Sequence, residues 1–121
     1  KVVALCDIRP ECVEKSQNIL KKAGLPEAAS YTGTEDAWKQ LCERDDIDLV
    51  YIATDWKHHA EMGVYAMEHG KHVAIEVPAA MTLEAYQHSL ENSQTLYAAG
   101  ELCIRFLRND NFEHGSTRSI R

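Results

Sequence analysis

The chain has few features that point to nucleic acid or to a membrane. Its 121 residues include 13 Lys and Arg against 19 Asp and Glu, a net charge of −6, and no basic run that could neutralise a phosphate backbone. No apolar run approaches the roughly 20 residues that cross a bilayer. We therefore expect neither nucleic acid nor a membrane as a partner.

The cysteines are few and widely spaced. They are Cys6, Cys12, Cys42 and Cys103, too far apart for the Cys-x-x-Cys spacing of metal or redox sites. Three of them fall on strand or helix faces that we expect to be buried. We interpret the cysteines as reduced core residues, with a free reactive thiol as the alternative.

Apolar runs alternate with amphipathic segments along most of the chain. The short apolar runs predict strands at residues 1–6, 31–32, 48–54, 72–75 and 102–107. Three- and four-residue spacing predicts helices between them, which begin near Pro10, Thr34, His58 and Thr82. Strands and helices that alternate with short links favour an α/β fold with a parallel, doubly wound, Rossmann-like sheet and right-handed crossovers.

The spacing of apolar residues also predicts which faces of the helices and strands are buried and where the helices end. The first helix is expected to pack through a stripe of Cys12, Ser16, Ile19, Leu20 and Ala23, and to stop at Gly24. The strand at 48–54 is apolar on both faces, so we expect helices above and below it. The last helix is expected to be capped by Thr82, to include Tyr97 and to end at Gly100.

Residues 1–108 are expected to form one partial dinucleotide-binding domain. A complete doubly wound sheet with its helices usually needs somewhat more than 121 residues. Because the chain begins at Lys1 inside a predicted strand, we expect the natural N-terminus to lie upstream and assign no compartment. Residues 109–121 are polar without a periodic pattern, and we expect them to be disordered.

Asp7 follows the first predicted strand and precedes a helix. Dinucleotide-binding folds place a carboxylate there to accept the hydroxyls of the adenosine ribose, which favours NAD because a 2′-phosphate would be repelled. The positive charge of Arg9, two residues later, would instead suit the 2′-phosphate of NADP. The other interpretation, with equal weight, is that Asp7 only caps the helix that begins at Pro10. The glycine-rich turn that precedes such a carboxylate by about 20 residues would lie before Lys1.

A second polar group follows the strand at 48–54 and opens the next helix. It consists of Trp56, Lys57, His58 and His59. At the end of a central strand these residues would face a ligand crevice, where an indole packs on a flat ring and imidazoles exchange hydrogen bonds. The alternative is an ordinary helix start, with Asp55 as its cap and Trp56 as a packing anchor.

Glu76 and Val77 close the next predicted strand, and the carboxylate would face the same crevice. The alternative is an ordinary acid at a strand end. We favour function because three consecutive strands end in polar groups. We expect no metal site, since His59 and His69 lie at opposite ends of one predicted helix, roughly 15 Å apart at 1.5 Å per residue.

Three segments together resemble the Gfo/Idh/MocA oxidoreductase family. They are Asp48-Leu-Val-Tyr-Ile-Ala-Thr, Trp-Lys-His-His and Gly-Lys-His-Val-Ala-Ile-Glu-Val-Pro-Ala-Ala-Met-Thr-Leu-Glu, within a match over about residues 1–85. Most of that family carries Glu-Lys-Pro at the strand end, with a lysine that assists removal of a hydroxyl proton. This chain has Val77 at that position. Glu-Val-Pro-Ala-Ala instead resembles the NAD-dependent glycoside hydrolase branch that includes α-N-acetylgalactosaminidases.

The resemblance implies NAD as the cofactor and a sugar as the substrate. Asp7 would bind the adenosine ribose, Trp56 to His59 would line the nicotinamide side, and Glu76 with Val77 would contact the nicotinamide ribose. Hydrolysis would proceed by removal of a hydride from sugar C3, elimination at C1, hydration and return of the hydride. The catalytic residues would lie in a C-terminal domain outside this sequence, so none is assigned here.

Two other functions remain open. One is a sugar dehydrogenase of the same family that lost its lysine, and the other is an inactive fragment that binds nucleotide weakly or serves as an interaction module. The resemblance weakens after Thr82, because the glycosidase branch would place Glu-Asn on the next strand, whereas residues 102–107 contain Arg105 and no asparagine. A homo-oligomer is compatible with the sequence.

Overall fold

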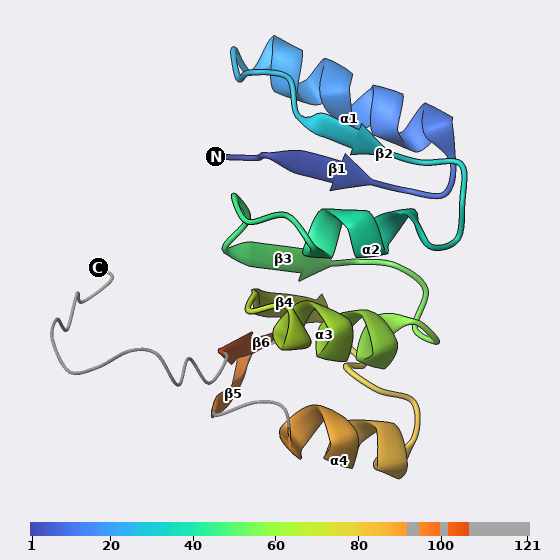
Figure 1. Cartoon of the computed structure of the whole chain (residues 1–121), viewed down its shortest axis with the longest axis vertical. Helices are drawn as coiled ribbons and strands as arrows, with labels where there is room; N and C mark the ends of the chain where they lie inside the picture. The colour runs from blue at the N-terminus through green and yellow to red at the C-terminus, as the bar shows by residue number, and fades with distance from the viewer. Residues whose placement is uncertain (92–94, 100–101, 107–121) are drawn as a thin grey trace, which may run out of the picture.

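The computed structural model describes residues 1–91, 95–99 and 102–106 of the chain. The strands are β1 (Ala4–Cys6), β2 (Ala29–Tyr31), β3 (Leu49–Ile52), β4 (His72–Glu76), β5 (Thr95–Ala99) and β6 (Leu102–Phe106). The helices are α1 (Pro10–Lys22), α2 (Ala37–Cys42), α3 (His59–Glu68) and α4 (Leu83–Glu91). Strands and helices alternate as far as α4 (Figure 1), which confirms the predicted α/β class.

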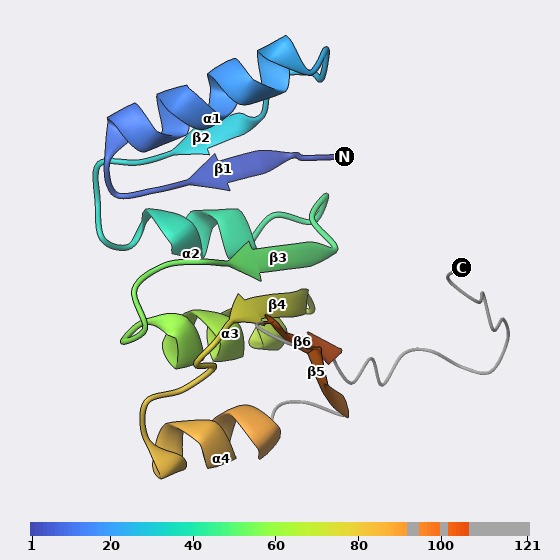
Figure 2. The ribbon, with the colours of Figure 1, turned by 180° about the vertical axis from the view of Figure 1, so that it is seen from behind.

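The strands form two sheets. β1 pairs with β2 in parallel in one sheet, and the other has the order β3-β4-β6-β5, in which β3 and β4 are parallel. Figures 1 and 2 show β1, β3 and β4 running in the same direction, so their carboxyl ends lie at one edge of the molecule. This arrangement confirms the predicted Rossmann-like character of the fold.

The prediction was wrong for the segment after α4. The last helix ends at Glu91, and the stretch that was expected to extend it to Gly100 contains β5, which pairs antiparallel with β6. β6 also runs antiparallel to β4, so the sheet is mixed and not parallel throughout. Thr95 to Tyr97 is rich in residues that favour strands, and a link as short as the one before Leu102 joins neighbouring strands only as a hairpin. Gly100 itself and the tail at 109–121 lie outside the described residues.

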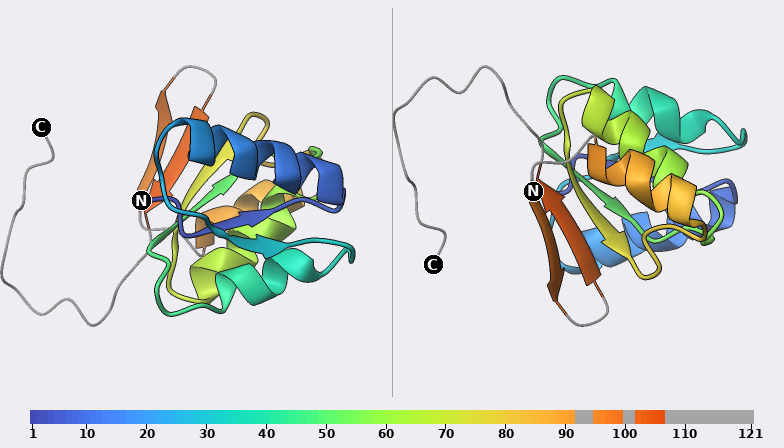
Figure 3. Two further views of the ribbon diagram at one scale, coloured as in Figure 1. Left: turned by 90° about the horizontal axis from the view of Figure 1, so that it is seen from above. Right: turned by 90° about the horizontal axis from the view of Figure 1, so that it is seen from below.

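The helices cover the two faces of the sheets unequally. Figure 3 shows α2 and α3 on one side of the strands and α1 on the other. The core between β3, β4, α2 and α3 contains Leu41, Cys42, Ile47, Val50, Ile52, Val64, Ala66, Met67, Val73 and Ile75. On the opposite face of β3, Leu49 is 56% exposed and Tyr51 58% exposed, so the expected second layer over this strand is wrong for the described residues.

α1 begins at Pro10 as predicted, and Gly24 follows it with a positive φ of 70°. Its buried face differs from the prediction, because Val13 and Leu20 are buried while Ile19 is 65% exposed. The reason is a tertiary contact on the same face. Gln17 donates from Nε2 to the Ala28 carbonyl and accepts from the Ala28 amide, which turns this side of α1 toward β2.

Two other local predictions need correction. α2 begins at Ala37, and neither Thr34 nor any other side chain caps it; the Thr34 carbonyl accepts a hydrogen bond from the Ala37 amide. The three described cysteines are free, but only Cys42 is buried, since Cys6 is exposed and Cys12 half-buried. The side chain of Cys103 lies outside the described residues. Thr82 does cap α4, because its Oγ1 accepts from the Ala85 amide at 3.1 Å.

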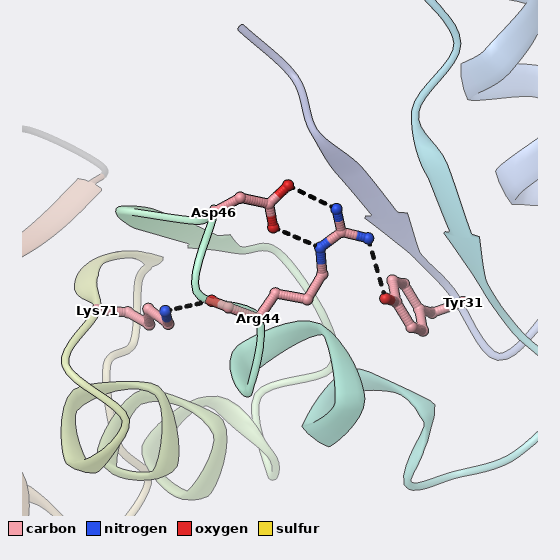
Figure 4. Close-up of polar contacts among 4 residues, drawn as sticks. All are labelled: Tyr31, Arg44, Asp46 and Lys71. Atoms are coloured by element: carbon pink, nitrogen blue, oxygen red, sulfur yellow. Dashed lines mark hydrogen bonds and ion pairs between the residues drawn. The ribbon is translucent and has the colours of Figure 1, made fainter.

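A polar cluster beside α2 links the two sheets (Figure 4). The Arg44 guanidinium makes two hydrogen bonds of 2.7 Å to the Asp46 carboxylate and donates to the Tyr31 hydroxyl at 3.2 Å. The buried Lys71 donates from Nζ to the Arg44 carbonyl. Because Tyr31 belongs to β2 and Lys71 precedes β4, this cluster connects the β1–β2 sheet to the sheet that contains β3 and β4.

Candidate functional site

Three polar segments meet at the carboxyl edge of the strands. The parallel register pairs Ile52 of β3 with Ile75 of β4, so the segments that follow the two strands emerge side by side. Asp7 comes directly after β1, which runs in the same direction (Figures 1 and 2). The structure therefore brings the ends of β1, β3 and β4 to one edge, as a ligand crevice at the carboxyl ends of the strands requires.

The Asp7 carboxylate closes a turn rather than capping α1. Its Oδ1 accepts a hydrogen bond from the Arg9 amide at 2.9 Å, and the Arg9 Nε lies 3.8 Å from the same oxygen. Arg9 itself occupies the N-cap position of α1, without a side-chain capping bond. Within the described part of the chain, Oδ2 of Asp7 has no hydrogen-bond partner, so one carboxylate oxygen is left to accept from a ligand.

The segment between β3 and α3 does not form an ordinary helix start. Trp56 is 59% exposed, which overturns its alternative interpretation as a packing anchor. The Asp55 carboxylate does not cap the helix backbone and instead lies 2.6 Å from Nδ1 of His58. A large indole left in solvent at the carboxyl end of β3, which is an edge strand of its sheet in the described residues and not the predicted central one, is a surface that a flat ligand ring can cover.

The Asp55–His58 pair sets the charge of this segment. Mainly because of their shared hydrogen bond, the pKa of His58 is raised above its ordinary 6.5 and the pKa of Asp55 is lowered below its ordinary 3.8. Lys57 lies elsewhere, as part of the lining of a groove of about 450 Å³ between α3 and α4. The four residues predicted together are thus distributed over different surroundings.

His59 is the member of this group that differs most from the prediction. Its side chain is 0% exposed, and both ring nitrogens face backbone carbonyl oxygens. The sequence predicts direct contact between His59 and the cofactor, but the burial of the ring favours an indirect role.

Glu76 is the last residue of β4, and Val77 follows it. The Glu76 carboxylate accepts a hydrogen bond from the Tyr51 hydroxyl at 3.3 Å, and Val77 is exposed. Partial desolvation of the hydroxyl, followed by the charge of Glu76 and its hydrogen bond, raises the pKa of the otherwise exposed Tyr51. The sequence analysis missed Tyr51, although the pairing of β3 with β4 and the alternation of strand faces could have placed it near Glu76.

The described residues show no grouping of three or more His, Cys, Asp or Glu side chains that could hold a metal ion. Every helix in the same residues is too short or too polar to span a lipid bilayer.

A sequence profile described as "Oxidoreductase family, NAD-binding Rossmann fold" matches residues 1–97. The chain belongs to the Gfo/Idh/MocA oxidoreductase family. The chain therefore represents the NAD-binding region of that family, and the family assignment supports NAD as the cofactor. This agrees with the resemblance of the segments around Asp48, Trp56 and Glu76.

Curated relatives within the family carry glycosidase names. The chain is 72% identical over 94 residues to glycosyl hydrolase family 109 protein 1 of Bacteroides thetaiotaomicron, an alignment covering 78% of this chain and 20% of that protein. It is 62% identical over 84 residues to alpha-N-acetylgalactosaminidase of Bacteroides fragilis, covering 69% of this chain and 20% of that protein. The chain thus spans about a fifth of the length of these relatives.

Solved structures of two sugar or inositol dehydrogenases have a similar fold over most of this chain. Myo-inositol 2-dehydrogenase from Lactobacillus plantarum superposes with a TM-score of 0.62 at 25% identity, over 75% of this chain and 24% of that one. Levoglucosan dehydrogenase, in complex with NADH and levoglucosan, gives a TM-score of 0.58 at 28% identity, over 74% of this chain and 22% of that one.

Proposed function

We propose that this chain is the NAD-binding part of an NAD-dependent glycosidase that acts on α-N-acetylgalactosaminides. The observation that carries the proposal is that β1, β3 and β4 end at one edge (Figures 1 and 2), where Asp7, Trp56 and Glu76 follow or end these strands in the sequence, in a chain 62% identical to an alpha-N-acetylgalactosaminidase over 84 residues. Sugar and cofactor would then meet beyond the ends of β3 and β4, where ligands of open α/β sheets bind.

The surroundings of these residues fit a dinucleotide. The unpaired Oδ2 of Asp7 is a suitable acceptor for ribose hydroxyls, and its charge disfavours a 2′-phosphate, so NAD fits better than NADP. The exposed Trp56 offers a flat apolar surface, while Glu76, oriented by Tyr51, offers a carboxylate to the second ribose. His58 and Val77 complete the proposed contacts, whereas Lys57 lines the groove between α3 and α4.

When bound, NAD would accept a hydride from the sugar and return it, so that hydrolysis ends without net reduction. This chain would orient the cofactor and shield it from water. Val77 has no proton to exchange, so it would contact the cofactor without taking part in proton transfer. A homo-oligomer belongs to the same proposal and would appear in light scattering as a mass above that of one copy.

The experiment uses the protein extended to the length of its relatives. We expect release of p-nitrophenol from p-nitrophenyl α-N-acetylgalactosaminide, with NAD required and no net NADH formed. The p-nitrophenyl β-anomer serves as the control substrate. Steady NADH accumulation with a free sugar, without release of p-nitrophenol, would overturn glycoside hydrolysis.

That second outcome corresponds to a sugar dehydrogenase. The observation in its favour is the fold similarity to the myo-inositol and levoglucosan dehydrogenases. The two functions would share the residues at the strand ends, and they differ in whether the hydride is returned.

A further inference from the structure

His59 is the most deeply buried ionisable side chain in the described residues. It is the first residue of α3 and is 0% exposed, whereas the neighbouring His58 lies at the surface in its pair with Asp55. Polar side chains are seldom buried without hydrogen bonds, so the partners of this ring show what it holds in place.

The two ring nitrogens contact two different segments. Nδ1 lies 2.9 Å from the carbonyl oxygen of Pro78, and Nε2 lies 3.1 Å from the carbonyl oxygen of Thr54. A carbonyl only accepts, so each contact is a hydrogen bond when the facing nitrogen carries a proton. The ring therefore stands between the backbone that follows β3 and the backbone that follows β4.

Both carbonyls lie next to predicted contacts of the cofactor. Thr54 is two residues before Trp56, and Pro78 directly follows Val77. No ladder bond continues into this region, because the paired residues of β3 and β4 end at Ile52 and Ile75. The spacing of the two segments beyond the sheet thus depends on groups such as the His59 ring.

We propose that His59 is a positioning residue that holds these two segments in register, so that Trp56 and Val77 present one surface to the nicotinamide end of the cofactor. The proposal rests on the proposed function for its ligand. The ring itself does not touch the cofactor, and His59 acts through the Thr54 and Pro78 carbonyls.

The first test uses this 121-residue chain without ligand. Glutamine places its amide nitrogen at about the position of Nε2, and asparagine at about that of Nδ1. His59→Gln should therefore keep the Thr54 contact and loosen the segment at Val77, and His59→Asn should do the reverse. Amide hydrogen exchange and chemical shifts around Trp56 and Val77, measured by NMR, report the two segments separately.

Met67→Ala is the matched control, because it removes a buried side chain from the other end of the same helix. It should destabilise the whole core without selectively loosening the segments at Trp56 and Val77. If the His59 variants change exchange throughout the core in the same pattern as Met67→Ala, His59 is an ordinary core residue and the proposal is overturned.

The second test measures NAD in the protein extended to the length of its relatives. His59→Gln and His59→Asn should raise the dissociation constant at least about 10-fold, since small displacements of positioning groups have effects of this order or larger. Met67→Ala should leave it within about two-fold wherever the variant is folded. Loosened segments with an unchanged dissociation constant would overturn the positioning role.

The two proposals fail in different ways. If the unsubstituted extended protein does not bind NAD, the proposed function is wrong, and the cofactor role of His59 falls with it. Binding of NAD by that protein, combined with unchanged exchange at Trp56 and Val77 in the His59 variants, would overturn the inference about His59 alone.

Discussion

At the scale of single residues, the carboxyl edge of the strands contains side chains whose protonation depends on a neighbouring charged side chain. The Asp55–His58 ion pair needs an ionised Asp55 and a protonated His58. Because the pKa of Asp55 is lowered, its contribution is present above its ordinary 3.8 and is lost as pH falls through the lowered pKa. Because the pKa of His58 is raised, its contribution is present below 6.5 and is lost as pH rises through the raised pKa.

We expect Asp55→Asn to bring the pKa of His58 down toward 6.5, since the hydrogen bond from Asp55 is the largest cause of its elevation. A histidine titration by NMR measures this. Glu61→Gln is the control, because Glu61 acts on His58 only as a weaker, more distant charge, and should lower the pKa less. An equal effect of the two substitutions would contradict the 2.6 Å contact.

Asp7 leads to a second prediction at this scale. In the protein extended to the length of its relatives, Asp7→Ala should weaken NAD binding about 10- to 100-fold, as loss of a charged hydrogen bond of about 1.5–3 kcal/mol implies. Calorimetry measures the affinity, and Asp45→Ala, which removes an exposed acid before β3, is the charge-matched control. An unchanged affinity in Asp7→Ala would mean that the carboxylate only forms the turn with Arg9 and does not bind NAD.

At the scale of elements, α3 packs closely against β4, and this contact positions the start of α3 near the candidate site. A Cβ on Gly63 would lie 2.7 Å from Cδ1 of Ile75, which is 1% exposed and has little room to move. Only a glycine lets the helix pack this near the strand. The same approach brings His59, at the start of α3, between the ends of β3 and β4.

Gly63→Val should lower the free energy of unfolding by about 1–3 kcal/mol, the usual cost of overpacking a core. Urea denaturation measures the change. Glu61→Val makes a β-branched substitution on the exposed face of the same helix and should change stability by only about 0.5 kcal/mol. Because valine has a higher helix propensity than glycine, an unchanged or raised stability in Gly63→Val would mean that helix propensity, and not the contact with Ile75, decides the outcome.

At the scale of the whole molecule, the described strands form two separate sheets rather than one continuous sheet. β1 and β3 belong to different sheets, and the cluster of Tyr31, Arg44, Asp46 and Lys71 connects them across α2 (Figure 4). The six residues ahead of Asp7 contain no glycine, and the strand ends described here include no glycine-rich turn of the kind that directs backbone N–H groups at a pyrophosphate. Binding of a whole dinucleotide therefore depends on more than the strand ends described here.

We expect NAD titrated into this 121-residue chain to bind too weakly to detect below millimolar ligand. Two charge-assisted hydrogen bonds of about 1.5–3 kcal/mol each correspond to a loss on the order of 10² or more in affinity. Isothermal calorimetry, or tryptophan fluorescence with Trp38→Phe so that only Trp56 emits, measures binding, with adenosine as the matched smaller ligand. Micromolar affinity for NAD would show that the strand ends alone suffice.

The amino-acid sequence by itself determined the alternation of strands and helices, the helix starts at Pro10 and Thr82, and the polar ends of three strands, because these depend on local periodicity, capping and turn residues. Tertiary structure decided the buried face of α1, where Gln17 bonds to Ala28, and the antiparallel pairing of β6. It also decided that His59 turns inward while Trp56 stays exposed. Those outcomes depend on contacts between segments distant in sequence, which local spacing does not encode.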